Sequence, residues 1–128
     1  MRRYRFVQLD VFTDRAFGGN QLAVFLEAAG LSDTEMRAIT REMNYSETTF
    51  VLPPSDPKAL RRVRIFTPTA ELPLAGHPTV GTTFALAYEG AIHAYDEQPI
   101  YLELGVGTLP IDLLFEEDHL SFVWMHQP

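Results

Sequence analysis

The sequence predicts an α+β fold in which a strongly curved, mostly antiparallel sheet wraps around one central buried helix, with a second helix at the periphery. The order of its predicted elements, β-β-α-β-β-α-β-β-β, is typical of this class. The second helix leaves almost no polar face, and a helix that is apolar nearly all round lies inside a protein. The chain has 128 residues, which suits one domain, so we expect residues 1–128 to form a single lobe.

Two strands are predicted at the N-terminal end. Residues 4–12 alternate between two faces, which is the period of a strand. The segment 17–20, Phe-Gly-Gly-Asn, is expected to form a turn because glycine and asparagine favour turn conformations. Residues 22–26 then predict a second short strand.

The first helix has a well-marked start. Ser32 and Glu35 stand three positions apart and fit the capping box, in which each side chain bonds the backbone N–H of the other residue. Leu31 and Met36 are placed for the hydrophobic staple that often accompanies this cap. Apolar residues then repeat at helical spacing, and we expect the helix to end near Met43.

Five further strands are predicted from apolar runs bounded by turn residues. A proline-rich loop separates the first two, and glycine-rich and acidic turns separate the last three, which we expect to be antiparallel. These strands cover residues 47–52, 62–67, 100–104, 108–115 and 120–125.

The buried helix is predicted over residues 79–89. Pro78 stands where the first helical position is expected, which suits its fixed φ and missing N–H. Gly90 stands where a left-handed C-terminal cap is expected. Gly81 and Ala85, four positions apart, would let another element pack closely against this helix.

Charge and hydropathy exclude several classes of partner. The formal net charge of −7 argues against nucleic acid or an anionic membrane. Apolar runs long enough to span a bilayer are missing, as is a secretory apolar core, so we expect a cytoplasmic protein. Arg61, Arg62 and Arg64 form a local basic cluster, which we interpret as a solvated strand edge rather than a phosphate site.

The chain contains no cysteine, which excludes disulfides, cysteine–zinc sites and any thiol nucleophile. His93, His119 and His126 do not have the spacing of metal ligands, and we expect them at the surface. We therefore expect no metal site.

Gly76 and His77 form the first candidate for chemistry. The first N–H groups of a helix have no internal acceptor and the dipole there favours anions, so this terminus could hold a carboxylate or a developing enolate. Gly76 would let a ligand approach the backbone, and His77 could donate a hydrogen bond or pass a proton. The alternative is plain helix capping, with the glycine present for chain geometry.

Glu47 is the second candidate. It stands between hydroxyl residues at the start of a predicted apolar strand, where partial shielding from water suits a residue that exchanges protons. A solvent-facing strand residue is the alternative, and it is the commoner fate of a glutamate. Asp10 and Asn20 are weaker candidates for lining a pocket, and Glu71 could form a structural ion pair.

Several motifs together resemble the PhzF-like isomerases, named for phenazine biosynthesis, in order, spacing and wording. The resemblance runs essentially from end to end and is specific as a set, although each motif alone is weak. The segments that carry it are Asp10-Val11-Phe12, Gly18-Gly19-Asn20, residues 41–48, Ile65-Phe66-Thr67-Pro68, residues 71–78 and Met125-His126-Gln127-Pro128.

The resemblance implies a diaminopimelate epimerase-like fold, in which two similar lobes face each other across a cleft. It implies cofactor-free proton transfer on carbon of a small cyclic or amino-acid-like carboxylate. Residues 1–128 would be the N-terminal lobe of such an enzyme. Related epimerases use one thiol from each lobe, so a chain without cysteine fits the branch that uses a glutamate.

Carried over by position, Glu47 and His77 would be catalytic. The residues expected to bind substrate are Gly76, Pro78, Thr79, Asn20 and Ser46.

Three hypotheses remain open for the lobe. A partner completes an enzyme, either as a homodimer or as a separate second-lobe chain. Alternatively, the chain is a non-catalytic lobe that binds small carboxylates or nothing. A third possibility is a lobe with an exposed apolar cleft face that self-associates without chemistry.

Overall fold

The computed structural model describes residues 3–11 and 20–126, with Asn20 described by its backbone alone. The turn expected at 17–20 falls almost wholly outside these residues. Within them the chain forms two helices and eight strands: β1 Phe6–Val11, β2 Asn20–Phe25, α1 Asp33–Met43, β3 Glu47–Leu52, β4 Arg61–Phe66, β5 Glu71–Leu72, α2 Gly76–Tyr88, β6 Ile100–Leu104, β7 Gly107–Glu116 and β8 His119–Met125.

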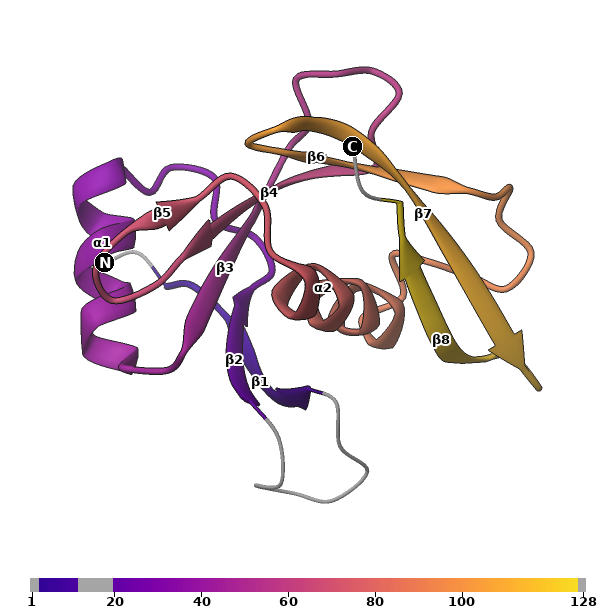
Figure 1. Cartoon of the computed structure of the whole chain (residues 1–128), viewed down its shortest axis with the longest axis horizontal. Coiled ribbons are helices and arrows are strands. Elements are labelled where there is room, and N and C mark those ends of the chain that lie inside the picture. Colours follow the sequence, from indigo (N-terminus) through magenta and orange to yellow (C-terminus); the bar gives the residue numbers. More distant parts are fainter. Residues whose placement is uncertain (1–2, 12–19, 127–128) are drawn as a thin grey trace.

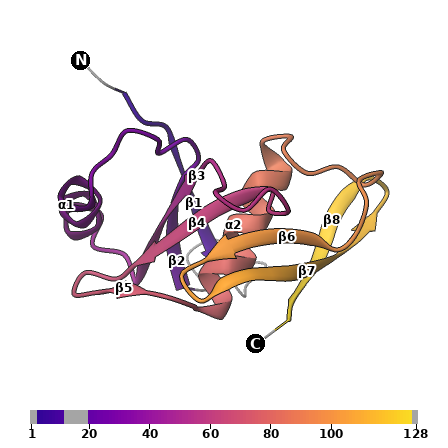
Figure 2. The same ribbon diagram turned by 90° about the horizontal axis from the view of Figure 1, so that it is seen from above.

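All eight strands belong to one sheet, ordered β1-β2-β3-β4-β6-β7-β8, with β5 paired to β4. The pairs β2–β3 and β4–β6 are parallel and the others antiparallel. The sheet curls around α2, while α1 lies outside it (Figure 1). Seen from above, the strands β1 to β4 separate the two helices (Figure 2). The predicted fold class is therefore confirmed.

The two faces of the sheet carry two separate cores. Alternation along each strand sends successive side chains to opposite faces. In β3, Val51 joins the inner core around Ala85 and Leu86 of α2, whereas Phe50 joins the outer core around Met36 of α1. Because both faces of β3 are buried, its sequence is nearly continuously apolar after the first residues.

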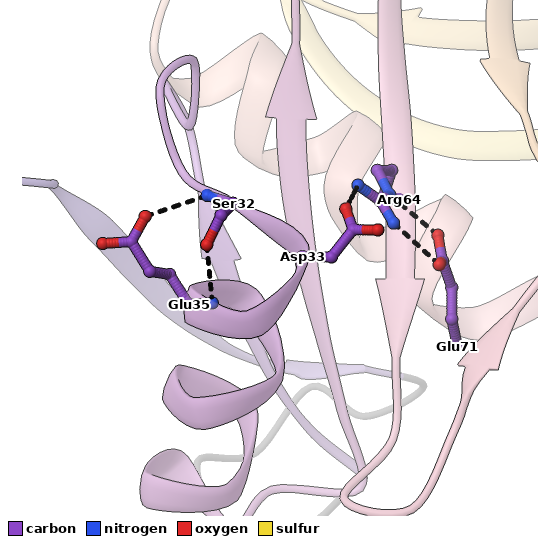
Figure 3. A network of polar contacts seen from close by, with 5 residues as sticks. All are labelled: Ser32, Asp33, Glu35, Arg64 and Glu71. Atoms are coloured by element: carbon purple, nitrogen blue, oxygen red, sulfur yellow. Dashed lines mark hydrogen bonds and ion pairs between the residues drawn. The ribbon is translucent and has the colours of Figure 1, made fainter.

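The start of α1 follows the predicted capping box. The Ser32 hydroxyl accepts from the N–H of Glu35 at 3.1 Å, and the Glu35 carboxylate accepts from the N–H of Ser32 at 2.9 Å (Figure 3). The left-handed residue Asn44, with φ 54°, ends the helix. Both predicted ends of α1 are confirmed.

Arg64 ties the start of α1 to β4 and β5 in the same region (Figure 3). Its guanidinium donates to both carboxylate oxygens of Glu71 at 2.8 Å and to Asp33 at 2.6 Å. The hydrogen bonds and positive charge of Arg64 lower the pKa of both carboxyl groups, and the carboxylates raise the pKa of Arg64.

The prediction that Arg61, Arg62 and Arg64 lie on a strand edge is wrong, although Arg62 is exposed to solvent as expected. β4 is an interior strand, paired with β3 on one side and with β5 and β6 on the other. The Arg64 side chain is only 16% exposed. A bidentate carboxylate partner explains how the sheet accommodates the charge at this position.

The buried helix α2 starts three residues before its predicted start, at Gly76. Pro78 is thus the third helical residue rather than the first, which is allowed because no N–H of the first turn has an acceptor within the helix. At the other end Gly90, with φ +85°, and Ala91 donate to Ala87 and Leu86. This pattern is a Schellman motif and confirms the predicted glycine cap.

Among the strands, β1 begins two residues after the predicted start at residue 4, and the predicted end at residue 12 lies outside the described residues. The strand β5 was not predicted because two residues give no periodic signal. The three strands β6, β7 and β8 are antiparallel neighbours in the order expected. Neither α1 nor α2 is long and apolar enough to cross a bilayer, and this holds for residues 3–11 and 20–126.

Candidate functional site

Glu47 and His77 come together although they are far apart in the sequence. The Oε1 atom of Glu47 contacts the Nε2 atom of His77, and their side chains are 13% and 19% exposed. Glu47 is therefore not the solvent-facing strand residue that the sequence left open. We refer to these two side chains as the Glu47–His77 pair.

The position of Glu47 follows from the end of α1 and the alternation of β3. Only Tyr45 and Ser46 separate the helix cap at Asn44 from the first residue of β3. Thr49, two residues further along the strand, contacts α2, so Glu47 faces the same helix near its N-terminal end. The parallel pairing of β2 with β3 fixes this strand beneath α2.

The first turn of α2 is open beside the pair. Its N-cap residue Ala75 provides no side-chain hydrogen bond, and no acidic residue stands in the first turn. Gly76 is exposed, its φ lies outside the left-handed range, and a Cβ there would have no heavy atom within 4 Å. Neither backbone geometry nor packing requires glycine here, so the capping alternative gives no reason for this residue.

The other predicted site residues are placed differently. Pro78 and Thr79 are buried, and the Thr79 hydroxyl donates to the carbonyl of Ala75 at 2.7 Å. They build the first turn and present no side chain at the surface. Ser46 is exposed directly before β3, and Asn20 begins β2 with its side chain outside the described part. The binding roles of these residues stay predictions.

Sequence reasoning missed a group of buried hydroxyls beside the pair. The hydroxyl oxygens of Thr49 in β3 and Thr82 in α2 lie 2.8 Å apart, and both residues are 0% exposed. Thr82 also donates to the carbonyl of Pro78 at 2.6 Å, and Thr83 donates to that of Thr79 at 2.8 Å. The available signal was the recurrence of threonine in a helix that is otherwise apolar, since buried hydroxyls need partners.

Two hollows lie in other parts of the lobe. The first hollow has a volume of about 490 Å³ and is lined by residues of β1, α2 and β8. The second has a volume of about 390 Å³, and its lining includes Leu26 and Arg61. Neither includes Glu47 or His77, so the substrate space predicted at the pair is not one of these hollows.

Within the part of the chain that the structure describes, no three His, Cys, Asp or Glu residues are grouped so that they could hold a metal ion. His93, His119 and His126 are exposed, as predicted. His126 contacts the carboxylate of Asp112.

Comparison with known proteins gives matches over almost the whole chain. The family described as phenazine biosynthesis-like protein, PhzC-PhzF, matches residues 9–128. The trans-2,3-dihydro-3-hydroxyanthranilate isomerase of Pseudomonas aeruginosa is 42% identical over 126 residues, which cover 98% of this chain and 43% of that protein.

Solved structures agree with these matches. A PhzF-family phenazine biosynthesis protein from Bacillus anthracis has a TM-score of 0.83 at 36% identity, over 98% of this chain and 40% of that chain. A hydroxyproline epimerase from Agrobacterium vitis has a TM-score of 0.72 at 14% identity, over 94% of this chain and 40% of that chain, which shows the fold alone. The chain thus spans less than half the length of each of these proteins, and its epimerase-like fold is confirmed.

Proposed function

Because this chain belongs to the phenazine biosynthesis-like (PhzF) family of isomerases, we propose that it carries one half of a cofactor-independent site for proton transfer on carbon. The proposed substrate is a small cyclic or amino-acid-like carboxylate. The mostly buried contact between Glu47 and His77, beside an uncapped helix terminus, is the observation that carries the proposal. The Pseudomonas aeruginosa relative is named for isomerising trans-2,3-dihydro-3-hydroxyanthranilate, a substrate of this class.

The first turn of α2 binds the substrate carboxylate in this proposal. The backbone N–H groups of Gly76 and His77 are the first two of the helix, and the helix dipole favours a negative charge there. The open space at Gly76 leaves room for close approach of an anion. No acidic residue stands within this turn, and the nearby carboxylate of Glu47 is in contact with His77.

Glu47 then acts as the acid–base residue. Its carboxylate takes a proton from a substrate carbon, and the electron pair of the broken C–H bond passes into the conjugated system toward the bound carboxylate. The helix N–H groups stabilise the negative charge that develops on oxygen. The protonated Glu47 returns the proton to a second carbon of the same system, so one C–H bond breaks, another forms, and the composition is unchanged.

His77 holds the carboxylate of Glu47 in place and can share its proton between the two steps. A second lobe supplies the opposite wall of the cleft, either from another copy of this chain or from a separate protein. Closure matters because excluding water strengthens the electrostatic interactions on which proton transfer depends.

Solvent deuterium incorporation tests the proposal directly. The purified chain is incubated in D2O with a cyclic dihydroaromatic carboxylate, and loss of the ring C–H signal is followed by proton NMR. We expect exchange that Glu47→Gln slows by at least about a hundredfold, because the acid–base group is removed. Glu42→Gln, the same change at an exposed position of α1, is the matched control and should keep the original rate. Equal rates for Glu47→Gln and the unaltered protein would overturn the proposal.

Carboxylate binding without turnover is the second candidate function, favoured by the first turn of α2, which has no side-chain cap and no acidic residue. Binding at the α2 terminus without any exchange would support it. Light scattering on a sizing column separates the routes to a complete site. A dimer would support a site formed by two facing copies, and a monomer would count against that route.

A further inference from the structure

A second polar contact joins β3 to α2 beneath the Glu47–His77 pair. Thr49 follows Glu47 by two residues on the same face of β3, and its hydroxyl oxygen lies 2.8 Å from that of Thr82. Both threonines are 0% exposed, whereas the pair above them is partly reached by solvent. Buried hydroxyls that bond across two elements restrict how those elements can move against each other.

The direction of these hydrogen bonds can be assigned. Thr82 lies one turn after Pro78 and donates to its carbonyl at 2.6 Å. A hydroxyl has one proton to donate, so Thr82 accepts from Thr49. The resulting chain runs from β3 through Thr82 to the first turn of α2, and it ends at the residue next to His77.

The two contacts have similar spacing along the strand and along the helix. Glu47 and Thr49 are two residues apart, which is about 6.7 Å along a strand. His77 and Thr82 are five residues apart, which is about 7.5 Å along a helix. Sliding α2 along β3 would therefore separate both contacts together, and it would leave the buried hydroxyl of Thr49 without its acceptor, whereas Thr82 would keep its bond to Pro78.

We propose that Thr49 and Thr82 are positioning residues that hold the first turn of α2 against β3 and so keep His77 on the carboxylate of Glu47. The proposal rests on the proposed function for its consequence in catalysis. The positioning itself concerns this chain alone and can be measured without turnover. Neither threonine touches the substrate in this account.

Thr48 provides a matched control in the same strand. It is also a threonine with 0% exposure, but it faces the opposite side of the sheet from Thr49. Its hydroxyl has no hydrogen-bond partner among the described residues. Thr49→Val and Thr48→Val therefore make the same chemical change at two fully buried positions. Only Thr49→Val removes a hydrogen bond to α2.

NMR of the His77 ring measures the coupling within the pair. In the unaltered protein we expect Glu47→Gln to shift the ring signal of His77, because the two side chains are in contact. In the Thr49→Val background this shift should fall to half or less, and in the Thr48→Val background it should keep its full size. Thr49→Ser restores the hydroxyl and should restore the shift.

If the unaltered chain catalyses deuterium exchange, the kcat and KM of that exchange give a second measurement. Thr49→Val should lower kcat by about tenfold to a hundredfold, the range expected when a catalytic group is misplaced by about 1 Å. KM should change little, because the N–H groups of the α2 terminus remain. An unaltered protein that is a dimer in solution and still shows no exchange would count against the proposed function and leave the NMR result standing.

An equal His77 shift in the Thr49→Val and unaltered backgrounds would overturn the positioning role. Equal losses in Thr49→Val and Thr48→Val would also overturn it, since they would trace the effect to general packing. If Thr49→Val fails to fold, Thr82→Ser tests the same bond from the helix. It keeps the hydroxyl and should keep the coupling, and a lost coupling would count against the proposal.

Discussion

Gly76→Ala replaces a hydrogen atom with a methyl group at the first helical residue of α2. The methyl group would have no heavy atom within 4 Å, and the backbone there does not need a glycine conformation. Alanine favours a helix over glycine by about 0.5–1 kcal/mol in the interior and by less at an end. We therefore expect the free energy of unfolding to stay the same or to rise by up to about 0.5 kcal/mol.

Carboxylate binding should change in the opposite direction. Each Cα–Cβ bond of a helix tilts toward its N-terminus, so the new methyl group at position 76 would stand beside the first N–H groups of α2. Hydrogen bonds to a charged acceptor contribute about 1.5–3 kcal/mol each. Loss of one such bond would weaken binding by about 10- to 100-fold, because about 1.4 kcal/mol corresponds to a factor of ten.

Urea unfolding and an NMR titration with a small carboxylate measure the two effects in one sample. Gly81→Ala is the contrasting variant, because a Cβ at Gly81 would lie 2.5 Å from Cδ2 of Leu22 and 2.9 Å from Cγ2 of Val11. It should destabilise the protein by about 1–3 kcal/mol through overpacking. A Gly76→Ala variant that binds as tightly as the unaltered protein would refute the assignment of the α2 terminus as the carboxylate site.

Three other predictions concern stability. Thr48→Val should raise the free energy of unfolding by about 1 kcal/mol, because it removes a buried hydroxyl without a partner among the described residues. An unchanged or lower free energy of unfolding in urea would contradict this reasoning. Glu71→Gln should destabilise the protein by about 1 kcal/mol at pH 7, since Arg64 loses its bidentate partner. Because Arg64 lowers the folded-state pKa of Glu71 below its ordinary 4.5, this contribution is present above pH 4.5 and lost as the pH falls through the lowered value, so unfolding curves of the two proteins should converge in acid. Ser32→Ala should cost about 1 kcal/mol in thermal unfolding, since it removes the hydroxyl that caps α1, and an unchanged midpoint would count against that role.

Local patterns in the sequence predicted most of the fold. The capping box at Ser32 and the glycine cap at Gly90 are complete within a few residues, so their chemistry can be read without tertiary information. The start of α2 was placed three residues late because Pro78 was read as a first helical residue, although any position of the first turn tolerates proline. β5 depends on pairing with β4, which no local pattern reveals.

The site could be predicted by its residue types but not by its contacts. Glu47 and His77 were candidates from the sequence, yet only the curvature of the sheet around α2 brings them together. The Thr49–Thr82 bond depends on the same long-range packing and had no local signal on the strand. Arg64 was assigned to an edge because the sequence does not show which strands pair on either side of β4.

The short connection between α1 and β3 makes the site sensitive to changes in chain length. Asn44 ends the helix, and only Tyr45 and Ser46 lie between it and Glu47. A connection this short cannot accommodate an insertion or a deletion without shifting β3. A shift of the strand by one residue would turn every side chain of β3 to the other face. Glu47 would then point toward α1, and the phenylalanine of the outer core would be driven against α2. Tyr45 packs against the outer core, and Ser46 is exposed. A gain or loss of one residue here would remove both the carboxylate and the packing that supports it.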